Sequence, residues 1–399
     1  MHVSYAKTVY GEKEIDAVVQ CLKESTQMGK YTRQFEASVA KLFDKRFGLF
    51  VNSGSSALYV SMESFNFPPG SEVITPALTF STTVGSIVKA GLIPAFVDVG
   101  ISDFVINVDK IEEMITPKTV AILAPNLLGN LCRWDSIKEI ANKYNLKIIE
   151  DSADTLGATL HGRSTGYWTD VSITSFYGSH IINCAGNGGM ACINSPEILE
   201  QAKLLRSWGR SSSLFDEQSE SVENRFNVNI DGISYDAKFL FEKIGYNVEG
   251  SEVGAAFGLA QLEDLESNIK ARILNYAAQT ELFARYEEFF ILPHETDGAR
   301  TGWLAYPILL RPDAPFTRKQ MQIELEKNNV QTRVIFTGNI TRQPGFKNID
   351  MKISKDGYVN ADNVMAHGVL LACHHGLNDA MLSYMHDVIE KFVRKESGK

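Results

Sequence analysis

The chain has 399 residues, which is too long for one small core and predicts about two domains. Hydrophobic residues make up 44% and charged residues 22%, as in ordinary soluble globular proteins. The formal net charge is −9 and the lysines and arginines are scattered, which argues against a nucleic-acid partner.

Targeting signals and cysteine motifs are missing from the sequence. Residues 1–7 lack the apolar centre of a signal peptide, and no stretch approaches the roughly 18 apolar residues of a membrane span. The five cysteines are widely spaced and form no CxxC pair, so neither disulfides nor a zinc site is predicted. We therefore expect a cytoplasmic protein with no membrane partner.

The first half of the chain alternates helical periodicity with short apolar runs. Residues 11–24 and 33–43 are predicted helices. The runs that follow suit strands buried on both faces of a mostly parallel sheet: 49–51, 72–74, 95–97, 120–123, 146–149 and 171–177. This alternation predicts an α/β layer.

The second half changes character after a glycine-rich loop at 186–189. Residues 211–236 are polar and are expected to form a long loop, and residues 253–270 one long helix. The remainder predicts an α+β region with a strand at 303–310 and helices at 317–328 and 380–395.

Three segments carry residues that could do chemistry. The turn at 51–58 (VNSGSSAL) can offer backbone N–H groups to an anion, although a plain tight turn explains it equally well. Asp151 follows a strand and could pair with a protonated ring nitrogen, or could simply cap a helix. His180 lies just beyond the strand at 171–177, where a lone histidine is more often structural than catalytic.

Motifs spread over almost the whole chain give a strong resemblance. They include VNSGSSAL at 51–58, TPALTFSTT at 75–83, EDSADTLGA at 150–158, SFYGSH at 175–180, LRSWGR at 205–210 and RVIFTGNITRQPGF at 333–346. With them the chain resembles the DegT/DnrJ/EryC1/StrS sugar aminotransferase family of pyridoxal phosphate (PLP) enzymes. The resemblance implies an aspartate-aminotransferase-like fold (PLP fold type I). A large domain at 1–240 would hold a mostly parallel seven-stranded sheet, and a smaller α+β domain would occupy 241–399.

The resemblance also implies roles for individual residues. Gly54, Ser55 and Ser175 would hold the cofactor phosphate, Phe80 would stack on the ring, and Asp151 would pair with the ring nitrogen. Asp154 would lie near the ring hydroxyl of the cofactor, at a position where many family members carry Gln. Asn247 would reach the cofactor phosphate of a neighbouring subunit, which implies a homodimer with shared sites. Arg333 and Tyr177 are candidate substrate contacts, each equally explained as a surface residue.

His180 is the main departure from the aminotransferase pattern. It stands where aminotransferases carry the lysine that binds PLP covalently, and no lysine occurs between Lys147 and Lys203. Imidazole cannot replace that covalent bond, but it can act as general acid and base near neutral pH. The same replacement marks a branch of 3-dehydratases of nucleotide 4-keto-6-deoxysugars, and this chain resembles that branch.

A CDP-sugar enzyme of that branch carries an iron–sulfur cluster, with cysteines after the WGR motif. Here that stretch reads SSSLFD, and no cysteine lies between Cys192 and Cys373. A cluster needs about four thiolates, so no metal site, no iron–sulfur cluster and no reductase partner are expected.

The expected activity is therefore a PLP/PMP-dependent C3 dehydration of a nucleotide-linked 4-keto-6-deoxysugar. L-Glutamate would regenerate pyridoxamine phosphate (PMP), and ammonia and a 4-keto-3,6-dideoxysugar would be released. A C4 aminotransferase, a non-catalytic nucleotide-sugar-binding homologue and a reductase-dependent dehydrase are the alternatives. GDP, CDP and dTDP are all candidate nucleotides.

Overall fold

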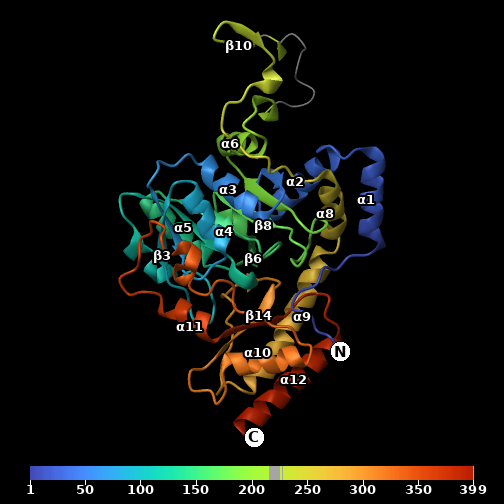
Figure 1. Cartoon of the computed structure of the whole chain (residues 1–399), viewed down its shortest axis with the longest axis vertical. Coiled ribbons are helices and arrows are strands. Elements are labelled where there is room, and N and C mark those ends of the chain that lie inside the picture. The colour runs from blue at the N-terminus through green and yellow to red at the C-terminus, as the bar shows by residue number, and fades with distance from the viewer. Residues whose placement is uncertain (215–224, 227, 399) are drawn as a thin grey trace.

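A seven-stranded sheet forms the centre of the computed structural model, which describes residues 1–214, 225–226 and 228–398 (Figure 1). The strand order is β1-β9-β8-β5-β4-β2-β3. In chain order the strands are β1 (Phe47–Val51), β2 (Glu72–Pro76), β3 (Ile93–Val97), β4 (Thr119–Pro125), β5 (Lys147–Asp151), β8 (Val171–Ser175) and β9 (Gly189–Ile193). Strand β9 is antiparallel to both of its neighbours, and all other neighbouring pairs are parallel. The predicted mostly parallel sheet is confirmed.

Successive apolar residues of each strand pack into cores on opposite faces of the sheet. Ile148 lies in one core with Trp134 of helix α5 (Trp134–Tyr144). Its neighbour Ile149 lies in the other core with Ala57 and Ala202, from helices α3 (Gly54–Ser64) and α6 (Pro196–Arg206). Because both faces are covered, the strands are apolar throughout, and this explains the continuous hydrophobic runs in the sequence.

Three helices pack together beside the β1 edge of the sheet. Helices α1 (Glu12–Glu24) and α2 (Lys30–Leu42) match the two predicted N-terminal helices, and both contact α8 (Glu252–Leu262). The carboxylate of Glu252 accepts hydrogen bonds from the backbone N–H groups of Gly29, Tyr31 and Thr32, at the start of α2. Buried acceptors there satisfy N–H groups that have no partner within the helix.

The single helix expected at 253–270 is wrong. The chain forms α8 and then a separate helix, α9 (Leu265–Ala284), with a break at Glu263 and Asp264. Both acidic side chains form ion pairs with Lys13 of α1 (3.3 and 2.7 Å), so a long-range contact accompanies the break. The apolar periodicity continues across it, and for that reason the sequence pattern showed one helix.

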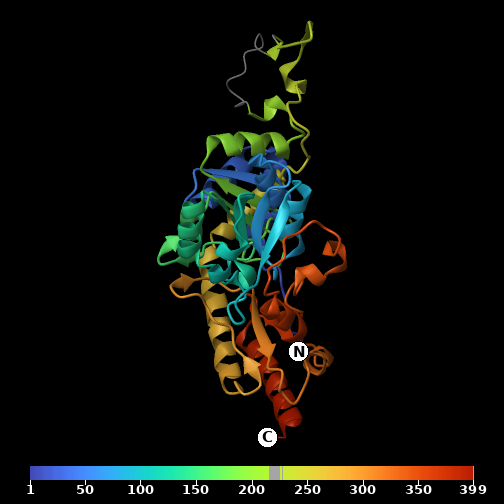
Figure 2. The same cartoon turned by 90° about the vertical axis from the view of Figure 1, so that its left-hand side faces the viewer.

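A smaller α+β unit follows and is built on a second sheet. Strands β12 (Phe290–Ile291), β14 (Ala305–Leu310) and β15 (Gly368–Ala372) are antiparallel. Helices α10 (Arg318–Lys327), α11 (Val359–His367) and α12 (Asp379–Ser397) surround them together with α9 (Figure 2). The predicted strand at 303–310 and helices at 317–328 and 380–395 are confirmed. The domain boundary between 240 and 241 stays a prediction.

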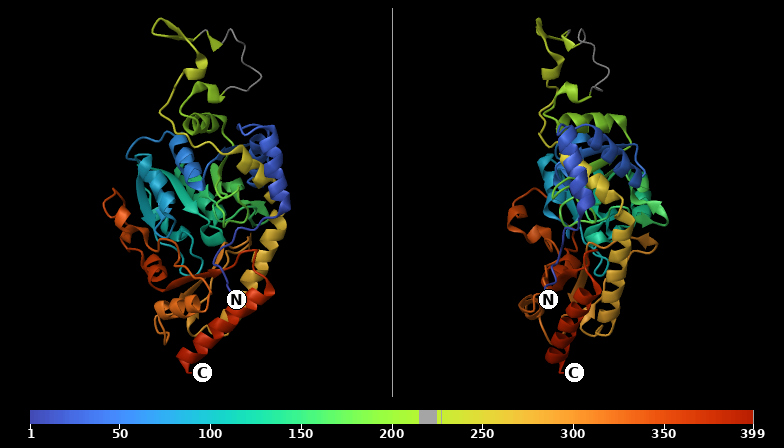
Figure 3. Two further views of the ribbon diagram at one scale, coloured as in Figure 1. Left: turned by 45° about the vertical axis from the view of Figure 1, so that its right-hand side comes forward. Right: turned by 90° about the vertical axis from the view of Figure 1, so that its right-hand side faces the viewer.

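The described residues of the polar segment 211–236 project away from the sheet (Figure 3). Its described part contains a short 3₁₀ helix at Ser211–Leu214 and a hairpin of β10 (Val228–Ile230) and β11 (Ile233–Tyr235), so the expected loop is wrong for those residues. The hairpin turns at Asp231-Gly232, both with positive φ, as an Asp-Gly turn requires. Residues 215–224 and 227 lie outside the described part. Among the described helices, none has the length and apolarity needed to cross a membrane.

Candidate active site

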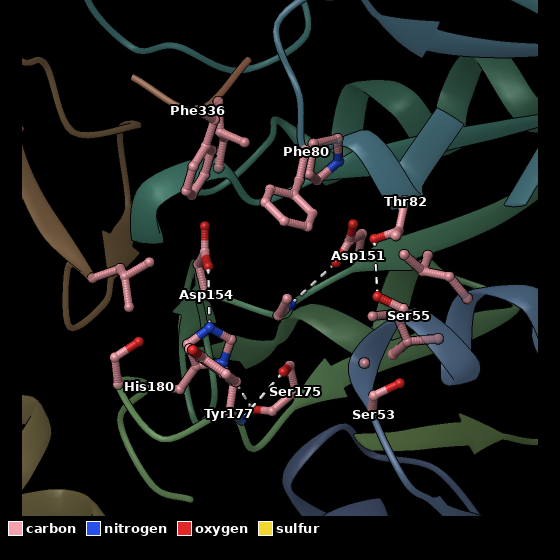
Figure 4. Close-up of a pocket in the computed structure, with 18 of the residues that line it drawn as sticks. Ser53, Ser55, Phe80, Thr82, Asp151, Asp154, Ser175, Tyr177, His180 and Phe336 are labelled. Atoms are coloured by element: carbon pink, nitrogen blue, oxygen red, sulfur yellow. Dashed lines mark hydrogen bonds and ion pairs between the residues drawn. The ribbon is translucent and has the colours of Figure 1, made fainter. Parts of the chain in front are cut away.

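A cavity of about 420 Å³ opens at the carboxyl ends of the parallel strands (Figure 4), where open α/β sheets bind their ligands. Eight of the predicted site residues line it: Gly54, Ser55, Phe80, Asp151, Asp154, Ser175, Tyr177 and His180. The structure thus brings together residues from four separate segments of the chain.

One end of the cavity is formed by the start of helix α3. Ser53 caps this helix, because its hydroxyl accepts a hydrogen bond from the N–H of Ser56 (3.1 Å). The N–H groups of Gly54 and Ser55 have no acceptor within the helix, since they belong to its first turn. A Cβ on Gly54 would lie 2.6 Å from the Cβ of Ser175, so glycine is needed for this close approach. Backbone donors, hydroxyls and the positive end of the helix dipole make this end suited to a phosphate.

Asp151 lies at the end of strand β5, in the middle of the cavity floor. Its carboxylate accepts hydrogen bonds from the hydroxyl of Thr83 (2.8 Å) and the N–H of Ala153 (3.2 Å). Burial raises the pKa of Asp151 to about 6. Within the described part of the chain, no lysine or arginine forms an ion pair with this carboxylate. A cationic ligand placed here would therefore relieve the cost of burying it.

Asp154 and His180 face each other at the opposite end of the cavity. Asp154 Oδ1 lies 4.0 Å from His180 Nε2, and Asp154 Oδ2 accepts a hydrogen bond from the N–H of Leu128 (2.8 Å). The two side chains are only 10% and 15% exposed. Burial raises the pKa of Asp154 to about 7 and lowers that of His180 to about 4, so burial favours the neutral form of each residue.

The hydrogen bond on the far side of the ring defines the tautomer of His180. Nδ1 lies 3.1 Å from the carbonyl oxygen of Ser175, and a carbonyl oxygen can only accept. In the neutral imidazole the proton is therefore on Nδ1, and the lone pair of Nε2 points to the cavity and Asp154. That nitrogen is free to take a proton from a bound ligand.

Aromatic side chains cover the cavity opposite its carboxylates. Phe80, at the start of α4 (Ser81–Lys89), meets Phe336 edge to face with ring centroids 5.8 Å apart. Phe80 is 50% exposed although it lines the cavity, so one of its faces is open to a flat ligand ring. The sequence reasoning did not single out Phe336, Thr82 or Tyr5, which also line the cavity. Phe336 and Thr82 belong to quoted motifs, whereas no local pattern marks Tyr5.

Two predicted residues do not line this cavity. Asn247 is exposed and pairs through its backbone with Ser207, so its predicted role toward a second subunit stays a prediction. Arg333 is also exposed, and its guanidinium lies over the ring of Tyr5 at 5.4 Å. Arg333 is therefore connected to the cavity through Tyr5, which lines it.

Arg206 and His374 have structural partners, and Cys184 is buried without a disulfide. Arg206 forms an ion pair with Glu36 (3.0 Å), and His374 Nε2 lies 3.0 Å from the carbonyl oxygen of Ser4. Cys184 is buried, like the other four cysteines, and all five are unpaired. In the described ranges no group of three or more His, Cys, Asp or Glu residues is placed to hold a metal ion.

Comparison with known proteins gives the family. The DegT/DnrJ/EryC1/StrS aminotransferase family matches residues 9–391, so the chain belongs to that family. A dTDP-4-dehydro-2,6-dideoxy-D-glucose 3-dehydratase from Saccharopolyspora spinosa is 34% identical over 379 residues, covering 92% of this chain and 81% of that protein.

Solved structures of related enzymes show the same fold. An Escherichia coli GDP-4-keto-6-deoxy-D-mannose-3-dehydratase with bound hydrated PLP matches with a TM-score of 0.87 and 26% identity, over 98% of this chain and 100% of that one. A GDP-4-keto-6-deoxymannose-3-dehydratase with a trapped PLP-glutamate geminal diamine gives a TM-score of 0.88 and 25% identity, over 97% and 100% of the two chains. The aspartate-aminotransferase-like α/β fold is thereby confirmed.

Proposed function

We propose that this family member is a PLP/PMP-dependent 3-dehydratase of a nucleotide-linked 4-keto-6-deoxysugar. It would use L-glutamate to regenerate PMP, and release ammonia and a 4-keto-3,6-dideoxysugar. The observation that carries the proposal is His180. A histidine with a free Nε2 faces the cavity at the position where the family's aminotransferases carry lysine.

The residues of the cavity fit the cofactor. Its phosphate would bind at the start of α3 through Gly54 and Ser55, with Ser175 nearby, and its ring would lie under Phe80. Asp151 would hold the protonated ring nitrogen, and this pairing would offset the burial of its carboxylate. When bound, PMP supplies an amine for the sugar ketone and a ring that accepts electrons.

His180 would move the proton in this scheme. Its Nε2 can accept a proton because burial keeps the imidazole neutral at physiological pH. It can then donate that proton to the departing C3 hydroxyl. Asp154, 4.0 Å from Nε2, would stabilise the imidazolium between the two transfers.

The absence of lysine favours dehydration over amination. No described residue that lines the cavity is a lysine, so none of them can bind the cofactor covalently and displace an aminated sugar. The specific relatives point the same way, since 3-dehydratases are among both the sequence relatives and the solved structures. A C4 aminotransferase remains the second candidate, because the family carries that name and the cofactor-binding residues would serve both reactions.

We also propose a homodimer with shared sites and no iron–sulfur cluster or reductase. The exposed Asn247 is available to a second subunit. The stretch after LRSWGR contains no cysteine, and glutamate would supply the amine of PMP in place of reducing electrons.

The test is a product assay. The purified protein is incubated with PLP, L-glutamate and a panel of GDP-, CDP- and dTDP-4-keto-6-deoxysugars, and products are followed by mass spectrometry with ammonia and 2-oxoglutarate assays. Loss of the C3 oxygen together with ammonia release is the expected result. An aminated sugar that retains its C3 hydroxyl would overturn the proposal in favour of the aminotransferase. His180→Asn serves as the matched inactive control.

A further inference from the structure

Helix α9 contacts the backbone on both sides of His180. Asn268 Nδ2 donates a hydrogen bond to the carbonyl oxygen of Ile181 (3.2 Å). Arg272 Nη2 donates one to the carbonyl oxygen of Ser179 (3.4 Å). These two donors are four residues apart, on one face of the helix. They hold the carbonyl groups of the residues directly before and directly after the histidine.

From this arrangement we infer that Asn268 and Arg272 are positioning residues for His180, an inference that rests on the proposed function. A third contact completes the arrangement, because Nδ1 of His180 is bonded to the carbonyl oxygen of Ser175. Backbone and ring are thus held independently. This is needed where one imidazole nitrogen must serve two different atoms of a ligand.

Arg272 is an unusual residue for a purely structural role. Its side chain is fully buried, and its Nη1 donates to the carbonyl oxygens of Trp303 and Leu304 (both 3.0 Å). Nε has no hydrogen-bond partner among the described residues, and no carboxylate there lies within ion-pair distance. A buried cation without a carboxylate in direct contact is costly, and an apolar side chain would fill the same space at lower cost. The charge itself therefore needs an explanation.

Nearby titratable groups supply that explanation. His180 is faced by Asp154, by Tyr177 and by the charge of Arg272. After burial and the Ser175 contact, the charge of Arg272 is the remaining influence on the pKa of His180, and it lowers that pKa. Arg272 also interacts electrostatically with Asp154, Tyr5, Cys373, His374 and His375. Burial comes first in lowering the pKa of His180, and the charge of Arg272 would add to it, whereas the uncharged Asn268 would only position the imidazole.

This difference allows positioning to be separated from general stability. We would compare Arg272→Met, Arg272→Lys and Asn268→Ala with Lys270→Met, a control on the same helix whose side chain is 67% exposed. For each variant, kcat and KM are measured in the product assay. The pKa of His180 is measured by NMR of the cofactor-free protein labelled with ¹³C-histidine. The signal of His180, one of eight histidines, is assigned with His180→Asn.

The inference predicts a different pattern for each variant. Asn268→Ala lowers kcat about 10-fold, with unchanged KM and an unchanged pKa of His180. Arg272→Met lowers kcat about 10- to 100-fold, the scale of a misplaced catalytic group, and raises the pKa of His180. Arg272→Lys keeps the charge but loses the forked geometry, so it lowers kcat without raising that pKa. Lys270→Met changes neither quantity.

Two results would overturn the inference. One is a lower melting temperature with wild-type kcat per folded enzyme in Asn268→Ala and Arg272→Lys. The other is an unmoved pKa of His180 in Arg272→Met. If Arg272→Met does not fold, kcat and KM of the two milder variants decide. If the wild-type chain dehydrates no sugar, the proposed function fails, and the pKa of His180 in Arg272→Met still decides the inference independently.

Discussion

Replacing Asp151 with asparagine should strengthen the cofactor-free fold and weaken cofactor binding. Folding raises the pKa of this carboxyl from 3.8 to about 6, so the stability contributed by its protonated form is present at low pH and is lost as pH rises through that window. The difference corresponds to a cost of about 3 kcal/mol at about pH 8 and about 1 kcal/mol at about pH 4.5. Asparagine avoids this cost but loses about 1 kcal/mol of hydrogen bonding. We therefore expect Asp151→Asn to raise the free energy of unfolding by about 2 kcal/mol at the higher pH and by almost nothing at the lower.

Urea denaturation of the cofactor-free protein at the two pH values measures this effect. Asp297→Asn is the matched control, because the Asp297 side chain is 98% exposed. In parallel, a PLP titration should show about 10- to 100-fold weaker binding, since a buried charge-assisted hydrogen bond contributes about 1.5–3 kcal/mol. Equal destabilisation at both pH values would refute the reasoning about the buried charge. Unchanged PLP affinity would refute the assignment of Asp151 to the ring nitrogen.

Four further predictions concern the cavity and its supports. His180→Asn should lower the dehydration rate at least about 100-fold while PLP affinity, measured by absorbance titration, changes little. Gly54→Ala should weaken PLP binding, because its methyl group would meet a neighbouring side chain at 2.6 Å, whereas Gly11→Ala, whose methyl meets nothing within 4 Å, should not. The pKa of Asp154 is raised to about 7, so the carboxylate that stabilises the imidazolium of His180 is lost as pH falls through that value, and kcat should fall with it. Asp154→Asn should remove this step from the pH profile of kcat. Glu252→Gln should lower the free energy of unfolding by about 1–3 kcal/mol with unchanged kcat, since this carboxylate holds the start of α2.

Much of the large sheet could be predicted because its strands are buried on both faces and therefore read as continuous apolar runs. Strand β9 escaped prediction because it follows a glycine-rich loop and begins with Gly189. A Cβ on Gly189 would lie 2.2 Å from the carbonyl oxygen of Ser53, so the glycine permits β9 to pass close to the start of α3. The residue suggested a loop in the sequence, whereas its physical role is a close approach within a sheet.

The cavity residues could be predicted only in part. Residues at the carboxyl ends of strands, such as Asp151 and Ser175, are marked by local pattern, because the carboxyl ends of parallel strands lie at one edge of the sheet. Tyr5 reaches the cavity through long-range contacts: the N–H of Val3 bonds to Asn329, and the N–H of Tyr5 bonds to the side chain of Gln331. No periodicity near Tyr5 encodes those contacts, so only the folded chain shows them.

The opposite pKa shifts of Asp154 and His180 explain how one cavity can hold an acid and a base without fixing either in its charged form. Each shift comes first from burial, which penalises charge of either sign. The 4.0 Å gap between them leaves both groups free to exchange protons with a third partner. A direct, short ion pair would hold the imidazole permanently protonated and would remove its capacity to act as a base. The pair is therefore better suited to moving a proton than to stabilising the fold.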